Sequence, residues 1–133
     1  MTVGDSTATT FKRTIVVVDD DRDIRMILRA NLEDEGYAVL EAGGGREALE
    51  IIKESDPDLV VLDIMMPEVD GYDVLQELRS TPEFADLPVV LLTARRQESD
   101  VWEGWSAGAD YYITKPFKMD ELLKFIRYIF GED

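Results

Sequence analysis

Short apolar runs alternate with segments of helical periodicity along nearly the whole chain, and this alternation limits the possible folds most strongly. The runs are residues 15–18 (IVVV), 59–62 (LVVL), 89–92 (VVLL) and, more weakly, 111–114 (YYIT). The first three are apolar at every position, as in strands buried on both faces. The intervening segments repeat apolar residues every three or four positions, which indicates amphipathic helices. The pattern predicts a single doubly wound α/β domain of five strand–helix units around a central five-stranded parallel sheet.

The boundaries of the expected elements follow from apolar periodicity and from the Gly, Pro and Asp residues that mark turns and helix ends. We expect strands at residues 14–19, 37–41, 59–63, 88–93 and 110–113. We expect helices at residues 21–35, 47–55, 72–79, 97–107 and 119–130. In the first helix, the expected inner face carries Ile24, Ile27, Leu28 and Leu32. The domain is expected to cover residues 13–131, and the polar residues 1–12 to form a flexible tail.

The composition excludes several classes of function. The chain has 29 acidic and 14 basic residues and a net charge of −15, and such a surface repels nucleic acid, so we expect no direct binding to it. Cysteine and histidine are both absent, which excludes disulfides, thiol nucleophiles and an imidazole base. No apolar stretch approaches the ~20 residues of a membrane-spanning helix, and the N-terminus lacks a signal core. We therefore expect a cytoplasmic protein with no membrane partner.

Polar residues stand at or just after the ends of four of the expected strands. Asp19 and Asp20 come after the first apolar run, Asp63 after the run at 59–62, Thr93 after the next and Lys115 after the last. Because the carboxyl ends of parallel strands meet at one edge of a sheet, these groups should converge where open α/β folds bind ligands. Mg²⁺ binds one or two carboxylates and keeps several waters. The pattern predicts a cation site, with Asp20 and Asp63 as direct ligands and Asp19 acting through water.

The same constellation suits phosphoryl transfer. A carboxylate can attack phosphorus and form an aspartyl-phosphate. The reaction needs positioning and charge neutralisation, which the hydroxyl of Thr93 and the ammonium of Lys115 can supply. Asp63 is the expected nucleophile, because it should end the central strand.

Each of these residues also has an ordinary structural alternative. An aspartate pair after a strand commonly caps the next helix, although Asp21 and Asp23 can take that role here. Asp63 alone could form a turn, and Thr93 and Lys115 alone could be strand-end and loop residues. The order of these residues on separate strand ends favours a functional site.

Four motifs resemble those of the receiver domain of two-component response regulators. They are Val17-Val18-Asp19-Asp20, Leu62-Asp63-Ile64-Met65-Met66-Pro67 with Asp70-Gly71, Leu92-Thr93-Ala94, and Gly108-Ala109-Asp110 through Lys115-Pro116-Phe117. The resemblance covers about residues 14–130 and implies a CheY-like, flavodoxin-like fold.

The resemblance implies a role for each acidic position. Asp63 would accept the phosphoryl group. Asp19 and Asp20 would hold Mg²⁺ (or Mn²⁺) together with Asp63 and the backbone carbonyl of Met65. Lys115 would bind the phosphoryl group. Apart from self-catalysed phosphotransfer and autodephosphorylation, no enzymatic activity is expected.

The resemblance also implies switch and tuning positions. Thr93 would bind the phosphoryl group together with Lys115, and Tyr112 would turn inward when Thr93 moves towards the phosphate. Met65 and Arg95 lie two residues after Asp63 and Thr93, so we expect them to tune how fast water or a partner reaches the phosphate.

The implied donor is a phosphohistidine on a sensor histidine kinase or a histidine phosphotransfer protein. Phosphorylation adds about −1.5 to −2 charges. We expect it to switch the face formed by the helix at 97–107, the strand at 110–113 and the helix at 119–130, for a downstream protein effector or a homodimer. Because the sequence ends directly after the last helix, no output domain is expected, and a phosphorelay intermediate or phosphate sink is an alternative.

Two other classes of protein compete with this interpretation. An Mg²⁺-dependent phosphatase with an aspartyl-phosphate would place a second aspartate two residues after the nucleophile, where this chain has Met65. A flavodoxin-like cofactor binder would need a Ser/Thr/Gly-rich loop after the first strand, where Asp19, Asp20 and Asp21 stand.

Overall fold

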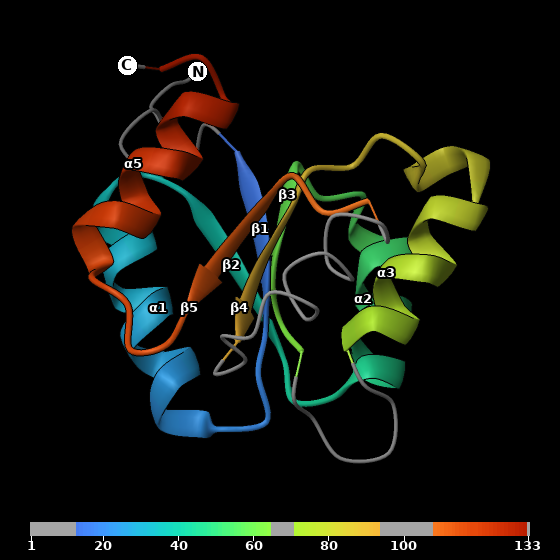
Figure 1. The fold of residues 1–133 in the computed structure, drawn as a ribbon, viewed down its shortest axis with the longest axis horizontal. Helices are drawn as coiled ribbons and strands as arrows, with labels where there is room; N and C mark the ends of the chain where they lie inside the picture. The colour runs from blue at the N-terminus through green and yellow to red at the C-terminus, as the bar shows by residue number, and fades with distance from the viewer. Residues whose placement is uncertain (1–12, 65–70, 94–107, 133) are drawn as a thin grey trace, which may run out of the picture.

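A five-stranded parallel sheet runs through the middle of the computed structural model, with helices on both faces (Figure 1). The structure describes residues 13–64, 71–93 and 108–132. The strands are β1 (Thr14–Val18), β2 (Ala38–Ala42), β3 (Leu59–Asp63), β4 (Val89–Thr93) and β5 (Tyr111–Thr114). Their order is β2-β1-β3-β4-β5, and every neighbouring pair is parallel. The predicted doubly wound α/β fold is confirmed, with the strand that ends in Asp63 at its centre.

Among the described residues, two α-helices cover each face of the sheet. The helices are α1 (Arg22–Asp34), α2 (Gly45–Ser55), α3 (Gly71–Ser80) and α5 (Met119–Ile129), with a short 3-10 helix, η2 (Pro82–Phe84), before β4. Figure 1 shows α1 and α5 on one face and α2 and α3 on the other. The expected helix at 97–107 and the expected tail at 1–12 lie outside the described residues. None of the helices in the described ranges has the length and apolar character needed to cross a membrane.

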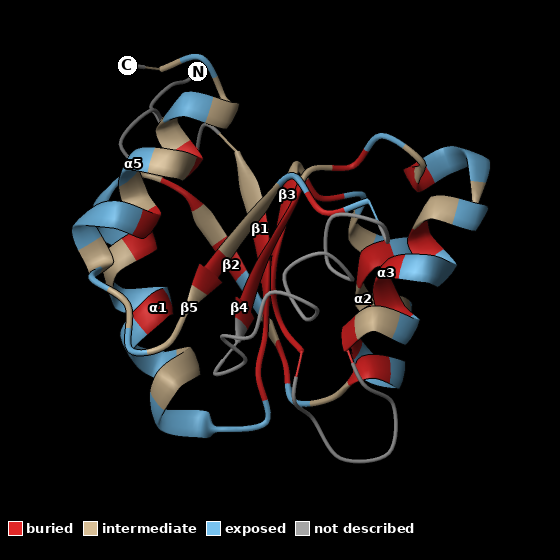
Figure 2. Ribbon diagram, in the orientation of Figure 1, coloured by how far each residue is buried: buried red, intermediate tan, exposed pale blue. Residues whose placement is uncertain are grey.

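The strands are apolar without interruption because each of their faces contributes to a separate core. In β1, Ile15 and Val17 pack with α1 and α5, whereas Val16 and Val18 pack with α2 and α3. Side chains alternate between the two faces of a strand, so a sheet covered on both sides buries every position. Figure 2 shows this directly, with buried residues along the central strands and on the inner sides of the helices.

The predicted inner face of α1 is wrong at one position. Leu28 and Leu32 are buried and Ile24 packs against the same core, but Ile27 is 57% exposed. Residues 24, 28 and 32 form an i, i+4 stripe along the helix. Consecutive residues are about 100° apart around an α-helix, so Ile27 falls outside that stripe.

Asp21 caps the N-terminus of α1, so Asp19 and Asp20 are not needed as helix caps. The Asp21 carboxylate accepts hydrogen bonds from the backbone N–H groups of Asp23 (2.9 Å) and Ile24 (3.4 Å), which makes it the N-cap. Asp23 lies in the first turn, where its charge complements the helix dipole. The cap expected at Asp21 is confirmed, and Asp19 and Asp20 do not serve this role.

The two ends of the described domain meet at the edge of the sheet where the parallel strands begin. The guanidinium of Arg13 lies 3.8 Å from the Glu132 carboxylate and 4.8 Å from the centre of the Phe130 ring. Tyr37, buried next to α1, donates a hydrogen bond from its hydroxyl to Glu132 (2.8 Å). Burial and the Glu132 carboxylate raise the pKa of Tyr37, because both disfavour a phenolate. These contacts tie the start of β1 to the end of α5.

Truncating two neighbouring residues of α1 tests the burial of its faces. We expect Leu28→Ala to lower the free energy of unfolding by about 2–5 kcal/mol, because it removes a buried side chain from the core. Ile27→Ala serves as the matched control, and its cost should stay within about 0.5 kcal/mol because that side chain is exposed. Urea denaturation of both variants measures the difference. Equal losses would show that Ile27 also belongs to the core.

Candidate functional site

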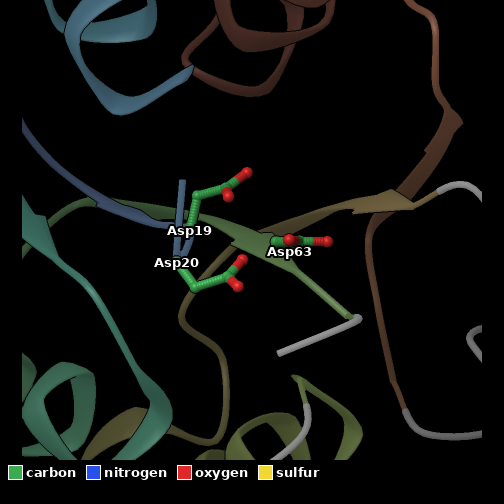
Figure 3. A group of neighbouring side chains, drawn as sticks. All are labelled: Asp19, Asp20 and Asp63. Carbon is green, nitrogen blue, oxygen red and sulfur yellow. The ribbon is translucent and has the colours of Figure 1, made fainter. Parts of the chain in front are cut away.

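Three aspartates converge where β1 and β3 end (Figure 3). Asp19 and Asp20 directly follow β1, and Asp63 is the last residue of β3. One carboxylate oxygen from each lies within 4.8 Å of the others. Figure 3 shows the three side chains extending from adjacent strand ends into a shared space. The structure therefore brings together the three aspartates that the sequence placed at these strand ends.

The three carboxylates differ in their exposure to water. Asp19 is 1% exposed and Asp63 is 4% exposed, whereas Asp20 is exposed. A buried charge is costly unless it is paired or binds a metal. Asp19 and Asp63 therefore need a cation beside them, and Asp20 adds a third carboxylate on the solvent side.

Lys115 supplies one such cation. Its Nζ lies 3.3 Å from Oδ2 of Asp19 and 3.5 Å from Oδ2 of Asp63. The lysine follows β5, and the peptide bond between Lys115 and Pro116 is cis. Three carboxylates and one ammonium leave a formal excess of two negative charges in this cluster.

Asp19 is held by its backbone as well as its side chain. Its N–H donates to the carbonyl of Ala42 on β2 (3.1 Å), and its own carbonyl accepts a hydrogen bond from Nη1 of Arg25 (2.7 Å). Its Oδ1 accepts from the N–H of Asp21 (2.9 Å), and its Oδ2 from Lys115. Both carboxylate oxygens of Asp19 thus have protein donors.

A glycine sets the backbone around Asp63. The N–H of Gly71 donates to the carbonyl of Ile64 (2.8 Å), at the start of α3. A Cβ at Gly71 would lie 2.6 Å from the carbonyl oxygen of Asp63 and 2.6 Å from Cα of Ile64. Only glycine allows α3 to begin this close to the end of β3. The N–H of Ile64 also donates to Leu92 (3.1 Å), which extends the pairing with β4 past Asp63.

The structure places Thr93 and Tyr112 on neighbouring strands, and it does not describe Met65 and Arg95. Thr93 is the last residue of β4, the strand next to β3, and pairs in register with Thr114 of β5. Tyr112 is half-buried on β5 and packs against the core shared with α2 and α3. Met65 and Arg95 lie outside the described residues.

Sequence reasoning missed Arg25 as part of the site, and saw Gly71 only as a turn residue. The arginines of α1 that follow the aspartate-rich segment were a possible signal for Arg25. The close approach of Gly71 to β3 has no comparable signal, because it depends on how α3 packs.

The donor set suits a hard divalent cation. It offers carboxylate oxygens from Asp19, Asp20 and Asp63, and it carries an excess of negative charge. Mg²⁺ prefers oxygen ligands and keeps several waters, so the exposed Asp20 leaves a suitable solvent-facing side. The residues therefore fit Mg²⁺.

Comparison with known proteins agrees with this geometry. A family model of the response regulator receiver domain matches residues 15–127. The chain belongs to this family. As a receiver domain of the two-component type, it takes part in phosphorylation-dependent signalling.

Curated relatives of this receiver domain are response regulators. It is 51% identical to response regulator MprA of Mycolicibacterium vanbaalenii over 113 residues, which cover 85% of this chain and 48% of the relative. It is 50% identical to MprA of Mycobacterium leprae over the same length, which covers 85% of this chain and 49% of that protein. The receiver domain thus spans about half the length of these relatives.

Solved structures show the same fold. Chemotaxis response regulator CheY4 of Vibrio cholerae is 30% identical, with a TM-score of 0.84, and the match covers 90% of this chain and 99% of CheY4. Response regulator TrrA of Thermotoga maritima, solved in complex with Mg²⁺ and BeF, is 37% identical with a TM-score of 0.78. That match covers 88% of this chain and 98% of TrrA. The CheY-like fold and the family suggested by the motifs are confirmed.

Adding one methyl group tests the close approach of α3 to β3. We expect Gly71→Ala to lower the free energy of unfolding by about 1–3 kcal/mol, because its Cβ meets the backbone of β3. Gly44→Ala is the control: a Cβ at Gly44 meets nothing within 4 Å, and the backbone there is extended. Its cost should be no more than about 1 kcal/mol, from the poorer N-cap of α2. Equal thermal melting of the two variants would contradict the close approach.

Proposed function

We propose that this receiver domain accepts a phosphoryl group on Asp63 in a reaction that requires Mg²⁺. The observation that carries the proposal is the burial of the Asp63 carboxylate on the central strand, within 3.5 Å of the ammonium of Lys115. Asp19 and Asp20 stand at the neighbouring strand end, so a cation that they bind would be held next to the acceptor.

Each residue near the acceptor has a proposed role. Asp20 and Asp63 would hold Mg²⁺ together with the backbone carbonyl of Met65. Asp19 would act through water, because its two oxygens already accept hydrogen bonds. When bound, the metal neutralises charge on the phosphoryl oxygens. Lys115 would bind one of these oxygens.

The transfer itself makes and breaks one bond to phosphorus. A carboxylate oxygen of Asp63 attacks phosphorus as the bond from phosphorus to the imidazole nitrogen of the donor breaks. With the other ring nitrogen of the phosphohistidine protonated, the donor leaves as a neutral histidine. Attack of water on the aspartyl-phosphate then releases phosphate and restores the carboxylate. Met65 and Arg95 would set the rate of this second step. The domain therefore catalyses only its own modification and demodification.

A phosphohistidine donor must lie outside these 133 residues, since they contain no histidine. We propose a sensor histidine kinase or a histidine phosphotransfer protein. An apolar surface pocket of about 250 Å³ is lined by Ile24, Ile27, Lys115, Pro116 and Phe117. Lys115 links this pocket to the acceptor, because its ammonium also contacts Asp63. The exposed side chain of Ile27 gives a protein donor an apolar contact next to Lys115.

The proposed switch passes from Thr93 to Tyr112. The phosphoryl group would draw the Thr93 hydroxyl towards it, and the half-buried Tyr112 on the adjacent strand would turn inward.

The proposed output surface is formed by residues 97–107, β5 and α5, of which β5 and α5 lie within the described residues. Tyr111 stacks on Phe125 at 4.6 Å between ring centres, and Tyr128 meets Tyr111 edge-on at 6.3 Å while remaining 65% exposed. Exposed aromatic side chains are enriched at protein interfaces, so this surface suits a protein effector or a second copy of the chain. The apolar Phe125 favours aromatic rather than charged contacts there. The net charge of −15 argues against nucleic acid as the partner.

Two alternatives use the same site differently. A phosphorelay intermediate or phosphate sink would share the chemistry and differ only in what removes the phosphoryl group. An Mg²⁺-dependent phosphatase is disfavoured, because Met65 occupies the position where such an enzyme needs its second aspartate.

Small phosphodonors test the acceptor directly. With Mg²⁺ and an acyl phosphate, we expect intact-mass spectrometry to show one added phosphoryl group on the wild type. Asp63→Asn should show none, because an amide is not a nucleophile towards phosphorus. Asp56→Asn, which changes the same charge at an exposed turn after α2, should react like the wild type. Equal adducts on wild type and Asp63→Asn would place the acceptor elsewhere.

Thermal melting tests the metal site. Mg²⁺ at 100 times its dissociation constant should stabilise the wild type by about 2.7 kcal/mol, because the assembled carboxylates exist only in the folded protein. Asp20→Ala should lose most of this rise in melting temperature. Asp86→Ala removes an exposed carboxylate after η2 and should keep the full response. NaCl of equal ionic strength controls for screening, and an undiminished Mg²⁺ response in Asp20→Ala would mean that the ligands are misassigned.

A further inference from the structure

Arg25 joins three parts of the fold at the acidic cluster. Its Nη1 donates to the main-chain carbonyl of Asp19 at 2.7 Å, and its Nε donates to Oε1 of Glu41 on β2 at 3.1 Å. Its side chain is only 18% exposed. One guanidinium on α1 therefore connects the end of β1 to the neighbouring strand β2.

The carbonyl that Arg25 binds belongs to the peptide between Asp19 and Asp20. A peptide unit is planar, so fixing its oxygen also fixes the N–H of Asp20 and the path of the chain into that residue. The N–H of Asp19 is already bound to Ala42, so its backbone is fixed on both sides. Asp20 is exposed and lacks a packed environment to orient it. The hydrogen bond from Arg25 supplies an orientation that burial does not.

Glu41 orients the guanidinium in turn. Its Oε2 accepts a hydrogen bond from Nη1 of Arg29 at 2.8 Å, and Arg29 also binds Glu33 at 3.1 Å. The hydrogen bond from Arg29, followed by the one from Arg25, holds the pKa of Glu41 below its usual range. Glu41 is therefore a carboxylate shared by two arginines one helical turn apart. Of these two, Arg25 reaches Asp19, whereas Arg29 points to Glu33.

We propose that Arg25 is a positioning residue that orients the Asp19–Asp20 peptide for binding a divalent cation. The inference rests on the proposed Mg²⁺ site. Under this proposal Arg25 strengthens cation binding. Its positive charge alone would weaken cation binding, because like charges repel. If Arg25 acted only through its charge, its removal would strengthen Mg²⁺ binding. If it only tied α1 to β2, its removal would lower stability and leave the affinity of the folded protein unchanged.

The decisive experiment compares Arg25→Gln with Arg29→Gln by calorimetric titration with MgCl₂. Both variants lose one positive charge from α1 and one contact with Glu41, but only the first loses the bond to Asp19. We expect Arg25→Gln to weaken Mg²⁺ binding roughly tenfold, as for other residues that orient metal ligands. Arg29→Gln should bind within about twofold of the wild type, since its side chain is 44% exposed and its charge is screened.

A third variant separates geometry from charge. Arg25→Lys keeps the charge but cannot bind Asp19 and Glu41 with one planar fork, so its affinity should fall between those of the wild type and Arg25→Gln. Thermal melting without metal checks that each variant is folded at the titration temperature. If Arg25→Gln does not fold, Arg25→Lys decides alone, and weakened binding supports the proposal while unchanged binding overturns it.

The outcomes distinguish this inference from the proposed function. Equal or tighter Mg²⁺ binding by Arg25→Gln would overturn the positioning role and leave the metal site intact. An equal loss in Arg29→Gln would also overturn it, because the effect would then come through Glu41. A wild type that does not bind Mg²⁺ would overturn the proposed metal site and this inference with it.

Discussion

The carboxylates of Asp19 and Asp63 are almost completely shielded from water, and both lie within 3.5 Å of the ammonium of Lys115. At an effective dielectric constant near 20, the repulsion between two carboxylates about 5 Å apart is about 3–4 kcal/mol. The attraction in each contact with the lysine is about 5 kcal/mol. Lys115 therefore offsets most of the repulsion among the three carboxylates. The desolvation of two buried charges remains, so the core of the domain must hold the cluster together and a further cation would relieve it.

The fold holds the main chain at the acidic cluster in place through contacts between elements. The parallel pairing of β1, β3 and β4 aligns the strand ends, and Gly71 lets α3 begin directly against the end of β3. Arg25 does the same for the peptide after Asp19. The backbones that carry the acidic side chains are thus oriented by contacts between elements of the fold.

The sequence indicated the fold and the acidic cluster because both depend on local patterns. Uninterrupted apolar runs identify doubly covered strands, and polar residues at their carboxyl ends fall at one edge of a parallel sheet. Tyr37 shows where this reasoning stops: we expected it to open the second strand, but β2 begins at Ala38, and Tyr37 is instead buried and bonded to Glu132, 95 residues away. Arg25 and Gly71 were missed for the same reason, since their roles come from contacts between elements.

The ion pair between Arg13 and Glu132 has a practical consequence for protein engineering. It places the two ends of the described domain side by side, at the edge of the sheet opposite the aspartates. A short linker could therefore join them, and the chain could be reopened in an exposed turn such as the one at Asp56. The domain is suited to circular permutation or to insertion into a host protein, where its phosphorylation state could be read as a change in the host.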